Sequence, residues 1–176
     1  MNIDNRSVHL IDNFLKPHEC DQIITYANSL KKHEEFLGRK IYLCKNISIL
    51  NPRIFLIYKK YVRKISNQFN FNLNFGQIVE WHSGLSCDIH KDITHPGDPC
   101  GDNFWTTVCY LNDDYQGGET IVDNQTFRPK KGQLLVFNGK VLSHGVSKIY
   151  GTRYTMIAWW SQFSENNGII LNNQNT

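Results

Sequence analysis

Four residues in two short stretches of the chain could together bind a metal ion and an organic anion. His90 and Asp92 lie two positions apart, His144 follows 52 positions after Asp92, and Arg153 comes nine positions after His144. Residues two apart on a β-strand face the same side, so His90 and Asp92 can reach one point from a strand end. With His144 from a distant strand, two imidazoles and one carboxylate can occupy one face of an octahedral metal site. The pattern therefore predicts a metal centre with open coordination positions.

Arg153 supplies the second half of the predicted site. A guanidinium offers a planar fork that grips a carboxylate through two hydrogen bonds, and an arginine buried in a small β core needs an anion. A His-x-Asp pair also occurs by chance, and Arg153 could instead pair with an acidic side chain on the surface of a strand. The three ligands match the arrangement of non-haem Fe(II) oxygenases. A dicarboxylate that chelates the metal at one end and meets Arg153 at the other would satisfy both halves.

Two amphipathic helices are expected in the first half of the chain. In residues 13–32, Pro17 suits a first helical turn, and the apolar residues recur at helical spacing. In residues 51–69, Asn51 is the expected N-cap and Pro52 the first helical residue. The apolar stripe of this second helix is Ile54, Tyr58, Tyr61, Val62, Ile65 and Phe69. Such helices need an apolar surface to cover, which we expect to be a sheet.

From Phe75 onward the sequence favours short strands. Runs rich in Val, Ile, Thr and aromatic residues alternate with turns rich in Gly, Pro and Asp, as strands and their connections do. The expected strands are residues 76–82, 105–112, 119–124, 133–139 and 152–161. The predicted fold class is α+β and mainly β, with the helices packed on one side of the β core.

The length and composition indicate one globular domain. The chain has 176 residues, of which 40% are hydrophobic and 20% charged, enough to bury a substantial core. We expect a helical support region at about 1–70, the β core at about 75–163 and a loosely ordered tail at 164–176.

Charge, cysteine and hydropathy patterns exclude several classes of protein. The net charge of +3 is spread over segments of mixed sign, so no nucleic-acid partner is expected. Five cysteines without CxxC spacing are expected to be free thiols. The start of the chain lacks the apolar run of a signal peptide, and no stretch is apolar enough for a membrane span. We therefore expect no membrane association and a cytoplasmic location.

Further segments accompany the four site residues in a fixed order along most of the chain. They are IDNFLKPHECDQII, Trp81-x-x-Gly84, YLNDDYQGGET, FRPKKGQLLVFNG and GTRYTMIAWW. Together they resemble the 2-oxoglutarate- and Fe(II)-dependent dioxygenases, and within them the prolyl 4-hydroxylase-like branch. Trp81 stands where that branch usually has Tyr, and Arg153 stands where many of its members have Lys.

The resemblance implies a fold, a set of cofactors and roles for individual residues. The implied fold is a double-stranded β-helix, or jelly roll, with the N-terminal helices packed on one sheet. The implied cofactors are Fe(II), held by His90, Asp92 and His144, with 2-oxoglutarate as cosubstrate and O2; ascorbate is allowed as an extra reductant. Arg153 would hold the C5 carboxylate of 2-oxoglutarate.

Four other residues have expected roles near that site. Tyr110 is the candidate for a second donor to the C5 carboxylate, and Thr155, on the same face as Arg153, for trimming the cosubstrate pocket. Trp81 is a candidate for the substrate wall, and Trp159 is a candidate either for that wall or for a contact behind the metal ligands. Tyr110, Thr155 and Trp159 could equally be residues of the packed core, because aromatic and β-branched side chains need no function to be buried in a sheet.

The resemblance also ranks the possible substrates. The first expectation is hydroxylation of a peptide or protein side chain, with proline in a peptide and its carbon 4 as target, and with residues 93–104 as a loop over the site. The alternatives are a free amino acid or small metabolite as substrate, and a non-catalytic metal-binding barrel of the cupin kind. Dioxygenases that demethylate nucleic acids carry a second Arg six residues after the first, where this chain has Trp159.

Overall fold

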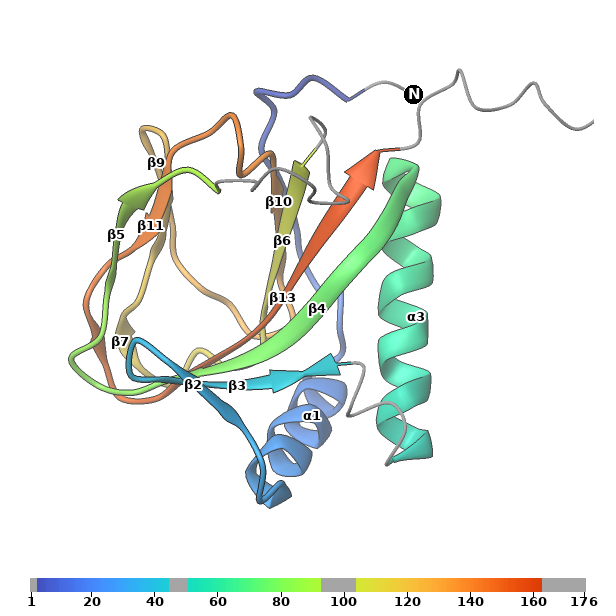
Figure 1. Ribbon diagram of the computed structural model, residues 1–176, viewed down its shortest axis with the longest axis vertical. Helices are drawn as coiled ribbons and strands as arrows, with labels where there is room; N and C mark the ends of the chain where they lie inside the picture. Colours follow the sequence, from blue (N-terminus) through green and yellow to red (C-terminus); the bar gives the residue numbers. More distant parts are fainter. Residues whose placement is uncertain (1–2, 45–50, 93–103, 163–176) are drawn as a thin grey trace, which may run out of the picture.

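The structure is a computed structural model that describes residues 3–44, 51–92 and 104–162. Its frame is a large antiparallel sheet with a smaller sheet on one side and two helices on the other (Figure 1). The large sheet contains, in spatial order, β1 (His9–Ile11), β10 (Leu134–Phe137), β6 (Phe104–Tyr110), β13 (Arg153–Gln162), β4 (Phe71–Trp81), β3 (Arg39–Leu43) and β2 (Glu34–Phe36). The smaller sheet contains β5 (Cys87–His90), β11 (His144–Val146), β8 (Thr120–Val122) and β9 (Gln125–Phe127). A two-stranded ladder joins β12 (Ile149–Tyr150) to β7 (Gln116–Gly117).

The two helices form where the sequence predicts them. Helix α1 spans Pro17–Ser29, and helix α3 spans Pro52–Phe69. The side chain of Asn51 accepts hydrogen bonds from the backbone N–H groups of Arg53 and Ile54, so it is the N-cap that the sequence predicts. The buried stripe of α3 is Ile54, Ile57, Tyr61, Ile65 and Phe69. It differs from the predicted stripe because Tyr58 and Val62 are only half-buried.

Two apolar layers hold the frame together. The larger one lies between the helices and the outer face of the large sheet, and Tyr61, Trp105 and Trp160 are fully buried in it. The second lies between the two sheets and contains Val108, Val122 and Phe137. The predicted α+β fold, a double-stranded β-helix with helices on one sheet, is confirmed.

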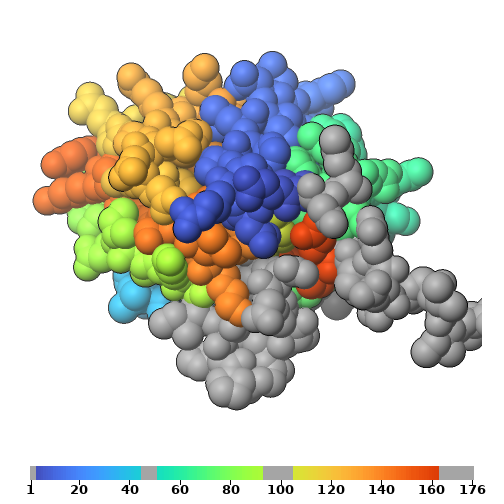
Figure 2. Space-filling model, turned by 90° about the horizontal axis from the view of Figure 1, so that it is seen from above, coloured from blue at the N-terminus to red at the C-terminus, as the bar shows by residue number. Residues whose placement is uncertain are grey.

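The N-terminal region also contributes strands that the sequence analysis did not predict. Strand β1 pairs with β10, with Leu10 opposite Leu135, and Figure 2 shows the blue N-terminal segment next to the orange part of the chain. Strands β2 and β3 form a hairpin that continues the large sheet beyond β4. The region at about 1–70 is therefore part of the sheet as well as its helical cover.

The remaining expectations concern cysteines, membranes and termini. Four cysteines are free thiols, as predicted: Cys20, Cys44, Cys87 and Cys109. Cys100, residues 93–103 of the expected loop and the tail 164–176 lie outside the described residues. Within the described part of the chain, neither helix combines the length and the apolar composition needed to cross a bilayer.

Candidate metal centre and anion site

The pairing of two short strands brings the two predicted histidines together. His90 is the last residue of β5 and His144 the first of β11, and they are direct partners in the antiparallel ladder. Their ring centroids lie 4.4 Å apart. Gly145 allows this close pairing, because a Cβ at that position would lie 2.7 Å from the carbonyl oxygen of Cys87. A side chain at position 145 would therefore push the two strands apart.

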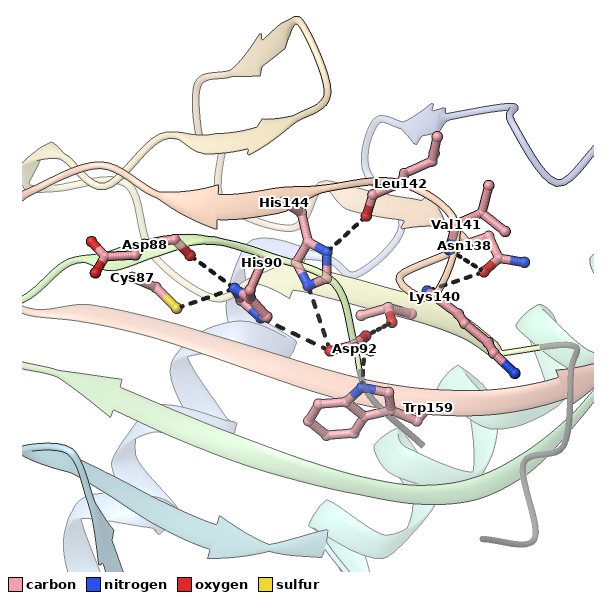
Figure 3. Close-up of polar contacts among 11 residues, drawn as sticks. Cys87, Asp88, His90, Asp92, Asn138, Lys140, Val141, Leu142, His144 and Trp159 are labelled. Carbon is pink, nitrogen blue, oxygen red and sulfur yellow. Dashed lines mark hydrogen bonds and ion pairs between the residues drawn. The ribbon is translucent and has the colours of Figure 1, made fainter. Parts of the chain in front are cut away.

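Asp92 lies two residues beyond the end of β5 and is fixed by three hydrogen bonds. Its backbone N–H donates to the carbonyl of Gly139 at 2.9 Å. Its Oδ2 accepts from Thr106 Oγ1 at 2.8 Å and from Trp159 Nε1 at 3.3 Å. These bonds leave Oδ1 facing the two histidines, 3.6 Å from His144 Nε2 and 4.0 Å from His90 Nε2 (Figure 3).

The hydrogen bonds of the two imidazole rings settle which nitrogen is free to bind a metal. His90 Nδ1 lies 2.8 Å from the carbonyl oxygen of Asp88, and His144 Nδ1 lies 3.1 Å from that of Leu142. A carbonyl oxygen only accepts, so each Nδ1 carries the proton and each Nε2 keeps its lone pair. Both lone pairs point toward Asp92, as Figure 3 shows. Hydrogen bonds from Nδ1 to a backbone carbonyl are the usual way in which proteins orient metal-binding imidazoles.

The donor set fits a divalent metal ion. The three ligand atoms of His90, Asp92 and His144 all lie within 4.8 Å of one another. Burial disfavours the charged form of Asp92, but the attraction to His144 in its protonated form and the hydrogen bonds from Thr106 and Trp159 outweigh it and lower the pKa of the carboxyl. The carboxylate is therefore ready to bind a cation. Two imidazoles and one carboxylate are the set that non-haem Fe(II) sites use.

Arg153 lies at the other end of the same space, at the start of β13. It is 1% exposed, and its Nη2 donates to Thr120 Oγ1 at 3.2 Å. Its Nε and Nη1 are buried without any hydrogen-bond acceptor. A buried cation with unsatisfied donors is unfavourable unless an anion completes the site. The guanidinium thus fits one carboxylate of a bound dicarboxylate.

Tyr110 lies beside Arg153. Its ring centroid is 5.6 Å from the Arg153 Cζ, and its hydroxyl donates to Thr120 Oγ1 at 2.7 Å. Burial raises the pKa of Tyr110, although the charge of Arg153 opposes the shift, so the hydroxyl keeps its proton. Thr155 is fully buried opposite Tyr110, and its Oγ1 has no hydrogen-bond partner.

A single cavity of about 340 Å³ joins the metal ligands to Arg153. Its walls are largely apolar and include Ile41, Phe75, Val79, Phe137, Val146 and Ile157. Trp81 and Trp159 also line it, whereas Tyr110 and Thr155 do not. Trp159 stacks on Phe75 with ring centroids 4.4 Å apart, and the buried Nε1 of Trp81 has no acceptor.

Several residues of the site were missed by the sequence analysis. Thr106 and Thr120 hold Asp92 and Arg153, but a threonine in a strand carries no signal of such a role. Trp159 was a predicted candidate, but its pairing with Thr106 across β13 and β6, which brings it to Asp92, is visible only in the register. Gly139 is also required, because a Cβ there would lie 2.1 Å from Asp92 Oδ2.

Comparison with known proteins agrees with this geometry. The model of the 2OG-Fe(II) oxygenase superfamily matches residues 76–161, which include all four site residues. A putative prolyl 4-hydroxylase of Acanthamoeba polyphaga mimivirus is 26% identical over 73% of this chain. The match covers 59% of the length of that curated relative.

Solved structures show the same fold. The viral collagen prolyl hydroxylase of Paramecium Bursaria Chlorella virus-1, in its 2OG complex, has a TM-score of 0.62 and 19% identity, over 89% of this chain and 96% of that one. A Trichoplax adhaerens prolyl hydroxylase in complex with a hypoxia inducible factor peptide fragment has a TM-score of 0.57 and 18% identity, over 88% and 83% of the two chains. The matched segment, the ligand cluster and the shared fold all make the chain similar to the 2OG-Fe(II) oxygenase superfamily.

Proposed function

We propose that the protein is a 2-oxoglutarate- and Fe(II)-dependent dioxygenase that hydroxylates proline within a peptide or protein. One observation carries this proposal: a cluster of two histidines and one aspartate shares a cavity with a buried arginine that has two unsatisfied donors. The first fits Fe(II), and the second fits the distal carboxylate of 2-oxoglutarate.

The side chains divide the work of the reaction among them. His90, Asp92 and His144 would hold Fe(II), and Thr106 and Trp159 keep the carboxylate of Asp92 aimed at it. When bound, Fe(II) with 2-oxoglutarate and O2 supplies the oxidising power to insert oxygen into a C–H bond, releasing succinate and CO2.

Arg153 would fix the far end of the cosubstrate. Thr120 connects its guanidinium to the Tyr110 hydroxyl, so the arginine cannot turn away from the cavity. The apolar walls exclude water from the space between Arg153 and the metal ligands, which strengthens every electrostatic contact inside it. Tyr110 acts here through Thr120, since its own hydroxyl is already donated.

Proline in a peptide is the favoured target for two reasons. The cavity beside the metal ligands is lined by Phe75, Val79 and Trp159, which suit an apolar ring. The matched mimivirus relative is named a putative prolyl 4-hydroxylase, and the Trichoplax enzyme is in complex with a peptide fragment. By that likeness the expected position of the new hydroxyl is carbon 4.

The proposal is tested by succinate release and mass spectrometry. The full chain is incubated with Fe(II), 2-oxoglutarate and a panel of proline-containing peptides, each matched by a peptide with alanine in place of proline. We expect proline peptides to raise succinate release and to gain the mass of one oxygen atom on proline. The alanine peptides and free L-proline should do so poorly.

Two results would contradict parts of the proposal. Robust hydroxylation of free L-proline, with no peptide turned over, would favour the amino-acid substrate. No succinate with any substrate, from a chain that binds Fe(II) and 2-oxoglutarate, would favour a metal-binding barrel without dioxygenase activity.

A further inference from the structure

A second arginine, Arg39, lines the same cavity and contacts the same tryptophan as Arg153. Strand β3 pairs Lys40 with Glu80, so one further step in the register places Arg39 beside Trp81. On the other side of β4, Arg153 is the direct partner of Trp81. The Cζ atoms of Arg39 and Arg153 lie 4.0 Å and 5.3 Å from the Trp81 ring centroid. Trp81 therefore lies between two guanidinium groups.

Arg39 has no anionic partner among the described residues. Its Nε is buried without an acceptor, and none of the ion pairs formed by residues of the described ranges includes it. The next residue, Lys40, faces the opposite side of the strand and pairs with Glu80 at 3.1 Å. The contact with Trp81 orients the plane of the Arg39 guanidinium, but it uses none of its N–H groups.

The other charges in the cavity balance without the positive charge of Arg39. Among the described residues that line the cavity, those that carry a full charge are Arg39, Asp92 and Arg153. Asp92 and a bound 2-oxoglutarate dianion would balance Fe(II) and one arginine. The charge of the second arginine stays unbalanced in a largely apolar cavity, where an unpaired charge is unfavourable.

Arg39 is also the arginine that lies nearer to solvent. It is half-buried, whereas Arg153 is 1% exposed. Arg39 follows the tip of the β2–β3 hairpin. Phe36, which pairs with Arg39 across this hairpin, is 57% exposed and also lines the cavity. Figure 1 shows this hairpin at the edge of the large sheet. A molecule that enters after 2-oxoglutarate would therefore meet Arg39 rather than Arg153.

We propose that Arg39 binds a carboxylate of the substrate, in a subsite distinct from the one that Arg153 provides for 2-oxoglutarate. This inference rests on the proposed function and narrows its substrate class. The preferred peptide carries an acidic side chain or a terminal carboxylate close to the target proline. Trp81 positions the guanidinium by stacking, so that its free N–H edge forms charge-assisted hydrogen bonds with that carboxylate.

Binding of matched ligand pairs tests this subsite without turnover. The full chain, loaded with Mn(II) and 2-oxoglutarate, is titrated calorimetrically with proline peptides that carry glutamate or glutamine next to proline. L-Proline and L-prolinamide form a second pair. We expect the parent to bind the carboxylate member about tenfold or more tightly. Arg39→Gln should lose that preference, while its dissociation constant for 2-oxoglutarate stays within about twofold of the parent value.

The control variants separate the subsite from general charge effects. Lys40→Gln removes the same charge from the same strand but on the opposite face, and it should keep the preference. Arg39→Lys, which keeps the charge but loses the planar fork, should keep part of it.

Three outcomes would overturn the inference. They are equal binding of the two members of each pair, a preference that survives in Arg39→Gln, and a weakened affinity of Arg39→Gln for 2-oxoglutarate, which would make Arg39 part of the cosubstrate site. A preserved carboxylate preference without any hydroxylation would leave this subsite standing and contradict the proposed function alone.

Discussion

At Arg153, Nε and Nη1 are buried without an acceptor, and Nη2 donates a hydrogen bond to Thr120. A carboxylate can accept from Nη1 and from the second N–H of Nη2, which share one edge of the guanidinium, with both oxygen atoms in one plane. A lysine at this position could supply a charge but only from a single nitrogen. The arginine therefore makes the cosubstrate site sensitive to the shape of the anion as well as to its charge.

Replacement of Arg153 should weaken the use of 2-oxoglutarate specifically. Arg153→Ala is expected to lower kcat/KM for 2-oxoglutarate by a factor that corresponds to about 2–4 kcal/mol, because the buried carboxylate of 2-oxoglutarate loses its cationic partner. Arg153→Lys should retain part of the activity. The measurement is succinate release at varied 2-oxoglutarate, with Arg63→Ala on the exposed side of α3 as control. Parent-like values for both Arg153 variants would place the anchor elsewhere.

Replacement of His144 should remove metal binding. His144 supplies one of the three candidate ligand atoms. It is only 9% exposed, whereas His90 is exposed, so water cannot easily take the place of His144 with the same geometry. His144→Ala is expected to lose measurable Co(II) binding in calorimetry and all succinate release. The control is His18→Ala, on the exposed side of α1. Full activity of His144→Ala would remove His144 from the candidate ligand set.

The residues that bind ligands directly were easier to predict than those that hold them. Histidine, aspartate and arginine have few chemical roles in an apolar core, so their types and their order along the chain already indicate a metal and an anion. Thr106 and Thr120 act through positions that only the strand register creates. Arg39 was missed because its hairpin, with two adjacent glutamates and an exposed phenylalanine, lacks the alternation typical of a strand.

At the scale of elements, Glu19 connects the two helices that cover the large sheet. It accepts a hydrogen bond from the backbone N–H of Lys16 at 2.8 Å at the start of α1. It also pairs with Lys60 of α3, with Nζ and Oε1 2.6 Å apart. Burial raises the pKa of Glu19, but the bonds from Lys60 and Lys16 outweigh it, and the pKa is lowered from its ordinary value of 4.5.

Glu19→Gln should therefore weaken the helical cover and change its response to acid. The free energy of unfolding is expected to fall by about 1–2 kcal/mol at neutral pH. Since the folded pKa is lowered, the stabilisation is present above pH 4.5 and is lost as the pH falls through the folded pKa. Urea unfolding between pH 7 and 3 measures both effects, with the exposed Glu34→Gln as control. A parent-like acid slope in Glu19→Gln would exclude this role.

The elements themselves were predicted unevenly. Helix α3 and strand β13 are long and periodic, so their existence followed from the sequence to within a few residues. Strand β1 has three residues and β2 has three, too few for periodicity to be visible. Each exists because a neighbouring strand offers an unpaired edge, which is a property of the assembled sheet.

On the scale of the whole molecule, the site lies between the two sheets and draws on both. Arg153 begins β13 and Trp159 lies six residues further along it in the large sheet, whereas His90 and His144 come from the smaller sheet. Asp92 joins the two, because it faces the histidines while accepting hydrogen bonds from Thr106 and Trp159. The spacing between the two halves of the site is thus set along a single strand, β13.

The pairing of His90 with His144 has a consequence for the stability of the smaller sheet. Among the described residues, strand β5 is an edge strand of the smaller sheet and pairs with β11. Bringing these two strands together closes a long loop, which costs chain entropy. An ion shared by the two histidines would act as a removable cross-link across that loop. Metal binding would then stabilise the pairing of β5 with β11, and removal of the metal would weaken it.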